Sequence, residues 1–307
     1  MQNRSIAGIV ALLLASLLWG TTGTTATFFP HNVSPLAIGA STMGIGGLLL
    51  FATSPRLSVG VLRDRTARRW VVLGAVGVFV YPLAFYTAMN LAGVAIGNVV
   101  ALGSGPLFAA VYEWVGERHP LSRLWAVSTG LAILGIGGLA IGRQASSGGT
   151  HGATLPGVAF GLLAGAAYAL YAYASSRAIQ SEQPSRGVMG AMFGIGAVVL
   201  MPVLLITGAP LLQSWQTVAI AGYLAIGPMF VAYLLFGIGL RTVRSSAATT
   251  ITLLEPVVAT LLAVLVVGER LAPVGWIGLL LVLGGLVMLV TARHQPKSGA
   301  ATLESGA

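Results

Sequence analysis

Long apolar stretches alternate with short polar gaps along the whole chain. A helix that crosses a membrane needs about 20 mostly apolar residues, and ten stretches of the sequence come near this length. Several gaps hold only a few residues, and such short connections predict tight helical hairpins. The pattern therefore predicts ten spanning helices, at residues 6–28, 34–53, 70–91, 94–114, 121–142, 155–178, 187–207, 214–240, 244–267 and 271–292.

The overall composition excludes a soluble globular protein. Of the 307 residues, 56% are hydrophobic and only 7% are charged, and the mean hydropathy is +0.90. Soluble domains carry roughly 25% charged residues. The predicted fold class is therefore an all-α integral membrane protein with ten transmembrane helices. The sequence contains no cysteine, which excludes disulfides and thiolate metal sites.

The basic residues predict how the helices are oriented. They lie in the short gaps between apolar runs, so the net charge of +9 does not indicate nucleic-acid binding. If the N-terminus is cytoplasmic, two basic residues, Arg143 and Arg270, fall outside, and the positive-inside rule is obeyed. Both termini are thus predicted to be cytoplasmic. The other fourteen of the 16 Lys and Arg residues fall inside: Arg4, Arg56, Arg63, Arg65, Arg68, Arg69, Arg118, Arg123, Arg177, Arg186, Arg241, Arg244, Arg293 and Lys297.

The sequence contains an internal repeat. The phrase GSGPLFAAVYEWVGER at residues 103–118 has a counterpart in LLEPVVATLLAVLVVGER at residues 253–270. A shift of 150 residues places Pro106 on Pro256, and a shift of 149 places Trp19 on Tyr168. Each half holds five predicted helices, and an odd number reverses the direction of the second half in the membrane. We predict two inverted five-helix repeats, at residues 1–148 and 149–292, and a polar tail at 293–307.

Together these features resemble the drug/metabolite transporter superfamily, and most closely its EamA-type exporters. The resemblance covers residues 6–292 and includes the opening LLASLLWGTTG at residues 13–23. Among members, the chain is most similar to bacterial aromatic amino acid exporters. The resemblance implies export of small metabolites by alternating access around a cavity at the membrane midplane. One departure is that the stretch from Pro106 to Glu117 is two residues shorter than that from Pro256 to Glu269.

Glu255 is the sharpest chemical feature of the sequence. It falls near the middle of the ninth predicted helix, where a charged side chain costs roughly 2.5–3.5 kcal/mol on insertion scales. One interpretation is that Glu255 contacts a substrate amine or carries a proton. The other is that it hydrogen-bonds backbone freed near Pro256, which has no N–H to donate. Its repeat counterpart is Gly105, so either role belongs to one half of the chain.

Aromatic residues recur at helical spacing inside four of the runs. Buried Tyr and Trp need partners for their polar atoms, which a wet central pathway would supply; packing in the core or against lipid is the alternative. The shared faces are Trp19 and Thr22; Phe79, Pro82, Tyr86 and Asn90; Tyr168, Tyr171 and Ser175; and Phe230, Tyr233 and Phe236. The candidate substrate-binding residues are Trp19, Thr22, Tyr86, Asn90, Asn98, Ser104, Tyr168, Tyr171, Tyr233, Phe236, Thr252 and Glu255.

The remaining acidic residues of the apolar runs are expected to be structural. Glu117 and Glu269 close the duplicated phrase beside Arg118 and Arg270, and we expect each to form a local ion pair or cap at a helix end. Glu113 lies within a turn of the interface, where we expect it to reach the headgroups or to pair with Arg118 or Arg123.

Glycines spaced four apart predict close helix packing rather than ligand binding. They are Gly157, Gly161 and Gly165 in the sixth run and Gly190 and Gly194 in the seventh.

The sequence favours a secondary transporter over an enzyme. It has no phosphate-binding loop of the GxxxxGK[ST] type, no paired metal-ligand spacing and no visible nucleophile–base set, so no cofactor, metal or catalytic residue is predicted. We expect a bacterial inner-membrane exporter of small metabolites, with amino acids, and aromatic ones first, as substrates. A multidrug or nucleoside exporter is the alternative, and a membrane-embedded enzyme or sensor a more distant one. The expected partners are a small-molecule substrate and the lipid bilayer, with no nucleic acid. The sequence does not give the oligomeric state, and a monomer is favoured.

Overall fold

A computed structural model describes residues 2–92, 94–118, 122–147, 155–268 and 270–292. Within these ranges the chain is helical, and ten stretches are long and apolar enough to cross a membrane. The ten predicted spans are therefore confirmed. The first half contains α1 (Gln2–Ala26), α2 (Pro35–Ala52), α3 (Pro55–Arg63), α4 (Arg65–Ala92), α5 (Val94–Glu117) and α6 (Arg123–Ser147).

The second half of the chain is more broken. Its helices are α7 (Leu155–Gln180), α8 (Ser185–Thr207), the 3-10 helix η1 (Ala209–Leu212), α9 (Trp215–Leu224), the π-helix η2 (Ala225–Val231), α10 (Ala232–Gly239), α11 (Ser245–Ile251), α12 (Leu254–Leu262), the π-helix η3 (Ala263–Val267) and α13 (Pro273–Ala292). The eighth span is α9, η2 and α10, and the ninth is α11, α12 and η3.

The short helix α3 and the early start of α4 were not predicted. Pro55 begins α3 at the position where a missing N–H costs nothing. Asp64 then accepts a hydrogen bond from the backbone N–H of Ala67 at 2.7 Å, so α4 begins at Arg65 instead of residue 70. The hydropathy pattern missed both features because this segment is rich in arginine.

The ninth span is interrupted beside Glu255. Helix α11 ends at Ile251, and α12 resumes at Leu254, so the break falls just before Glu255 and Pro256. Further along, η3 has i→i+5 hydrogen bonds, which enclose one more residue than α-helical bonds, and Gly268 ends the span at φ 79°. This π-helical turn accommodates part of the two extra residues between Pro256 and Glu269, relative to the stretch from Pro106 to Glu117. Glu269 itself lies outside the described residues.

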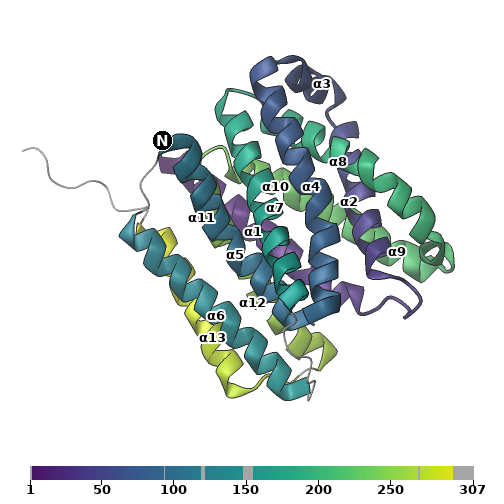
Figure 1. Cartoon of the computed structure of the whole chain (residues 1–307), viewed down its shortest axis with the longest axis vertical. Coiled ribbons are helices and arrows are strands. Elements are labelled where there is room, and N and C mark those ends of the chain that lie inside the picture. Colours follow the sequence, from purple (N-terminus) through teal and green to yellow (C-terminus); the bar gives the residue numbers. More distant parts are fainter. Residues whose placement is uncertain (1, 93, 119–121, 148–154, 269, 293–307) are drawn as a thin grey trace, which may run out of the picture.

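The helix packing follows the repeat. Figure 1 shows α6 and α13 side by side along one edge of the molecule, with α2 and α8 together toward the opposite edge. These are the fifth and tenth spans and the second and seventh, so equivalent helices pack on each other. Helix α7 packs against α4 and α5, and α1 correspondingly packs against α10 and α12. Each of these helix–helix contacts thus has a counterpart between the equivalent helices of the other half, as the predicted repeat requires. The inversion of the second half in the membrane remains a prediction.

Glycines let these helices approach closely, as predicted. A Cβ added at Gly165 would lie 2.7 Å from the carbonyl oxygen of Ala101 in α5, and one at Gly190 would lie 2.9 Å from the carbonyl oxygen of Leu50 in α2. Gly161 and Gly194 likewise face neighbouring side chains. The packing interpretation is therefore confirmed for these four glycines.

Candidate substrate-binding pocket

A pocket lies where the two halves of the chain meet. Its empty volume is about 690 Å³, part of which is continuous with the outside. Eight helical elements contribute to its wall. The lining residues are Trp19 and Thr22 of α1; Gly39, Thr42 and Met43 of α2; Tyr81, Pro82, Phe85 and Tyr86 of α4; Leu102 of α5; Tyr168 and Tyr171 of α7; Pro228 and Met229 of η2; Tyr233 of α10; and Glu255 of α12.

The pocket extends from the middle of the spans toward one end of the molecule. Thr22 lies near the end of α1 and Gly39 near the start of α2. Tyr168 and Glu255 lie near the middle of their spans, and Tyr233 lies toward the end of its span. The deep side of the pocket therefore faces the end of the molecule at which α1 begins.

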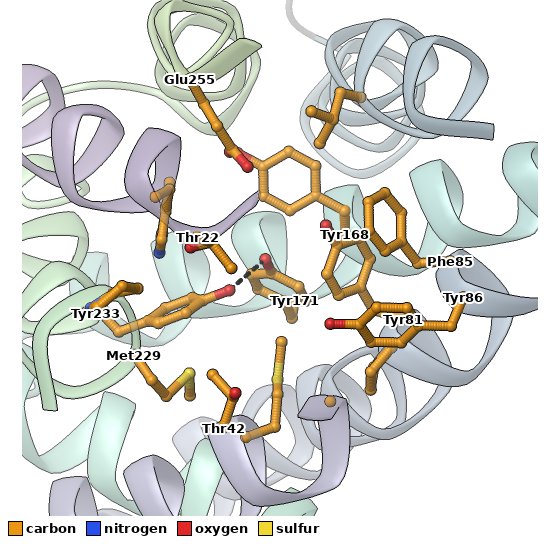
Figure 2. A pocket seen from close by; sticks show the side chains of 16 residues that line it. Thr22, Thr42, Tyr81, Phe85, Tyr86, Tyr168, Tyr171, Met229, Tyr233 and Glu255 are labelled. Atoms are coloured by element: carbon orange, nitrogen blue, oxygen red, sulfur yellow. Dashed lines mark hydrogen bonds between the residues drawn. The ribbon is translucent and has the colours of Figure 1, made fainter. Parts of the chain in front are cut away.

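Seven of the twelve predicted site residues line this pocket. Those that Figure 2 labels surround one space, with Tyr233 and Tyr86 on opposite sides. The seven are Trp19, Thr22, Tyr86, Tyr168, Tyr171, Tyr233 and Glu255.

Two more predicted residues support the lining from behind. The hydroxyl groups of Thr252 and Tyr168 form a buried hydrogen bond of 2.6 Å. Phe236 is fully buried, and its ring centroid lies 5.5 Å from that of Trp19. Both were predicted to contact substrate, but the structure places them one layer outside the pocket, where they hold Tyr168 and Trp19 in position.

Ser104 and Asn98 were also predicted, but they are not among the residues that line the pocket. The hydroxyl of Ser104 donates to the carbonyl of Ala101 at 3.3 Å, in the tight contact between α5 and Gly165 of α7. The Oδ1 atom of Asn98 is buried and has no hydrogen-bond partner among the described residues. The side chain of Asn90 lies outside the described part of the chain.

Several lining residues were not predicted from the sequence. Tyr81 and Phe85 stack with ring centroids 5.4 Å apart, and both line the pocket beside Tyr86. Tyr81 and Phe85 are four residues apart, as are Pro82 and Tyr86, which start one position later. The same helical spacing could therefore have predicted both pairs. Thr42 and Met229, by contrast, lie in apolar runs that carry no distinguishing pattern.

A layer of aromatic rings closes the deep side of the pocket. The hydroxyl groups of Tyr171 and Tyr233 are 2.9 Å apart and hydrogen-bonded, as the dashed line in Figure 2 marks. The ring of Tyr233 also lies 5.0 Å from that of Trp19 and 4.3 Å from that of Phe193. Edge and tilted contacts of this kind stabilise aromatic clusters beyond their buried area.

Glu255 contributes the charged group of the pocket. Its side chain enters from α12, and its carboxyl group is turned toward the aromatic side chains in Figure 2. Among the described residues, no hydrogen bond or ion pair involves this carboxyl group. The structure therefore shows no hydrogen bond between Glu255 and the backbone near Pro256, which was the second interpretation of this residue.

The repeat explains why only one half of the chain carries this carboxyl group. A Cβ added at Gly105, the counterpart of Glu255, would lie 2.8 Å from the ring of Tyr168. The first half therefore uses glycine where the second half uses glutamate, because the ring of Tyr168 occupies that space.

The expectation for Glu113 was wrong. Its side chain is only 4% exposed and does not pair with Arg118 or Arg123. Instead its carboxylate accepts hydrogen bonds from the hydroxyl and backbone N–H of Ser246, at 2.7 and 2.9 Å, and from the hydroxyl of Ser245 at 2.7 Å. These donors open α11, so Glu113 caps the start of that helix from a distant part of the chain, where negative charge is favoured.

The local ion pair expected for Glu117 was also wrong. Glu117 lies 3.3 Å from Arg177 of α7 and 3.4 Å from Arg244, which precedes α11. Arg118, its sequence neighbour, has a positive φ of 52° at the end of α5. Glu113 and Glu117 thus join α5 to α7 and α11 at the end of the molecule that lies beyond the aromatic layer.

Comparison with known proteins identifies the family. The sequence profile of the EamA-like transporter family matches residues 6–141 and again residues 155–291. The chain belongs to the EamA-like transporter family. This EamA-like protein is 33% identical over 294 residues to the uncharacterized transporter YwfM of Bacillus subtilis (strain 168), covering 94% of this chain and 96% of the relative.

Two further relatives have names that state a substrate. The threonine/homoserine exporter RhtA of Escherichia coli (strain K12) is 27% identical, with 94% of this chain and 93% of the relative covered. The aromatic amino acid exporter YddG of Ancylobacter novellus is 28% identical, with 95% and 100% covered. One solved crystal structure, at 23% identity and a TM-score of 0.77, covers 96% of this chain and 100% of that chain, which shows the shared fold. This EamA-like protein is thus a multi-pass membrane transporter of small molecules and not an enzyme.

Proposed function

We propose that this EamA-like transporter exports neutral amino acids, aromatic ones first, across the bacterial inner membrane by alternating access. The observation that carries the proposal is the pocket itself, which lies near the middle of the spans. Aromatic side chains surround it, and one carboxyl group, that of Glu255, projects into it. Apolar pockets with a few placed polar groups are typical of small-ligand sites.

The chemistry of the lining suits an amino acid with a flat side chain. The rings of Tyr81, Phe85 and Tyr86 offer apolar contact to such a side chain, and Glu255 offers a charged acceptor to an ammonium group. The two relatives named as amino acid exporters add support, although one is named for threonine and homoserine and the other for aromatic amino acids.

The arrangement of closed and open ends supports alternating access. The aromatic layer of Tyr171 and Tyr233 and the contacts of Glu113 and Glu117 seal the end at which α1 begins. If the N-terminus is cytoplasmic, as the basic residues indicate, this is the cytoplasmic end and the pocket opens toward the periplasm. In export, the sealed end would open to load substrate from the cytoplasm. It would then close, and the substrate would leave through the end that opens toward the periplasm.

A flat drug or a nucleoside would also fit an aromatic pocket, so the test compares substrate classes. Purified protein is reconstituted into liposomes loaded with an unlabelled compound, and uptake of the labelled compound by counterflow is measured for phenylalanine, threonine and uridine. We expect counterflow of phenylalanine above that of threonine, and none of uridine. Counterflow of uridine alone would favour the nucleoside exporter, and no counterflow of any compound would refute the proposal.

A further inference from the structure

We propose that the pocket recognises an ammonium group next to an aromatic body and has no cationic subsite for a carboxylate, so that aromatic monoamines are substrates in their own right. This inference rests on the proposed function of the pocket and goes beyond it. An aromatic monoamine such as 2-phenylethylamine has the body of phenylalanine without the carboxyl group.

The charge inventory of the pocket is the first observation. Among the described lining residues, Glu255 has a carboxyl group and none is Lys, Arg or His. A carboxylate moved from water into an apolar site is unfavourable unless a cation or several donors receive it. A zwitterionic amino acid bound beside an ionised Glu255 would place two negative groups and one positive group in the pocket. A monoamine would place one of each.

The hydroxyl groups are the second observation, because they could replace a cation. Those of Tyr171 and Tyr233 bond to each other, and that of Tyr168 bonds to Thr252. The hydroxyl of Thr42 donates to the backbone carbonyl of Ile38 at 2.7 Å. The other donors of the lining, on Trp19, Thr22, Tyr81 and Tyr86, are neutral. They would therefore receive a carboxylate without the opposite charge that Glu255 offers to an ammonium group.

The aromatic faces are the third observation. An ammonium group over the face of Trp or Tyr is attracted by the ring electrons, and the attraction is stronger when water is excluded. Trp19, Tyr81 and Tyr168 all line the pocket into which Glu255 projects. The faces of these rings add to the attraction of Glu255 for an ammonium group and do not attract a carboxylate.

The experiment compares three probes that share one aromatic body and differ in charged groups. They are 2-phenylethylamine, phenylalanine and 3-phenylpropionate. Each unlabelled probe competes against counterflow of labelled phenylalanine into liposomes, and counterflow of labelled 2-phenylethylamine is measured directly. Liposomes without protein give the leak of the uncharged amine. We expect 2-phenylethylamine to be carried, to compete at about tenfold lower concentration than phenylalanine, a difference of about 1.4 kcal/mol, and 3-phenylpropionate not to compete.

The outcomes separate this inference from the proposed function. Phenylalanine counterflow without transport of, or competition by, 2-phenylethylamine would overturn the inference and leave the proposed function standing. Transport of the amine alone would support the inference and refute amino acid export. Competition by 3-phenylpropionate equal to that of the amine would also overturn the inference, and transport of none of the probes would refute both.

A pair of variants adds a second readout. Glu255→Gln removes the charge, and we expect it to remove the advantage of the amine over phenylalanine. Glu182→Gln makes the same chemical change at an exposed position outside the pocket and should leave the order of the probes unchanged. A Glu255→Gln variant that keeps the tenfold advantage would contradict the role given to Glu255. If this variant does not fold, the order of the three probes in the unchanged protein still decides the matter.

Discussion

At the scale of single residues, the described carboxyl groups differ in what surrounds them. Asp64, Glu113 and Glu117 each have hydrogen-bond or ion-pair partners in the protein, and Glu182 is exposed to solvent. Glu255 instead faces the pocket with no such contact in the described structure. A group that is held in an apolar place without a protein partner is a strong candidate for binding a ligand.

The first prediction concerns transport by Glu255→Gln. Glutamine keeps the size and hydrogen-bonding capacity but loses the charge, and a hydrogen bond to a charged group contributes about 1 kcal/mol or more beyond a neutral one. We expect phenylalanine counterflow at limiting substrate to fall by about tenfold, while size-exclusion chromatography shows folded protein. Wild-type rates at every pH tested would rule out both proton transfer and an essential charge at this position.

The second prediction concerns the size of the substrate. Tyr86→Ala removes a ring that lines the pocket, so we expect phenylalanine transport to fall by about tenfold and threonine transport to fall much less. Tyr86 is a cleaner test than Tyr168, because Tyr168 also holds a hydrogen bond to Thr252 and packs on Gly105. Tyr223→Ala, which removes a tyrosine that does not line the pocket, is the matched control. Equal losses for both substrates in Tyr86→Ala would indicate general packing damage.

At the scale of helices, the seven-residue α11 depends on a cap from outside its own span. Helix ends leave backbone N–H groups without partners, and the carboxylate of Glu113 receives one of them together with two serine hydroxyls. This contact joins α5 to the broken ninth span, which also carries Glu255. The position of Glu255 is therefore linked, through α11 and α12, to the end of α5.

The third prediction follows from that cap. Glu113→Gln replaces one acceptor oxygen with an N–H donor group that faces other donors, so we expect a loss of stability of about 1–3 kcal/mol. The midpoint of thermal unfolding in detergent measures it. Glu182→Gln, at an exposed position, should change stability by less than about 0.5 kcal/mol. An unchanged midpoint for Glu113→Gln would show that the three hydrogen bonds contribute no net stability.

At the scale of the whole molecule, the direction in which the pocket opens depends on the orientation of the chain in the membrane. The pocket lies toward the end at which α1 stops, and the ion pairs of Glu117 lie at the other end. By the positive-inside rule, the end with the pocket faces the outside and the end with the ion pairs faces the cytoplasm.

The fourth prediction tests this orientation by labelling single cysteines from outside, which is clean because the chain has no cysteine of its own. We expect a membrane-impermeant thiol reagent to label Asn32→Cys in intact cells and Gly60→Cys only after the cells are broken. Gly60 is suitable because a Cβ there meets nothing within 4 Å, whereas its neighbour Ser58 is fully buried. Labelling of Cys at 60 but not at 32 in intact cells would reverse the topology.

The apolar runs, the basic gaps and the duplicated phrase were enough to predict ten spanning helices and the resemblance to EamA-type exporters. The reason is that lipid imposes its constraint on each span separately, through length and hydropathy. Helical spacing also found Trp19, Tyr86, Tyr168 and Tyr233, because a face of one helix can be read from one segment.

The tertiary structure decided what depends on contacts between distant segments. Glu113 meets Ser245 across 132 positions, and Tyr168 meets Thr252 across 84, so no local pattern could assign these partners. The break before α12 and the two π-helices lie in runs that are apolar apart from small polar residues and Glu255, and hydropathy there cannot tell one helical winding from another. Whether Ser104, Phe236 or Glu255 faces the pocket is set by how the helices rotate against each other, which is a property of packing and not of any single helix.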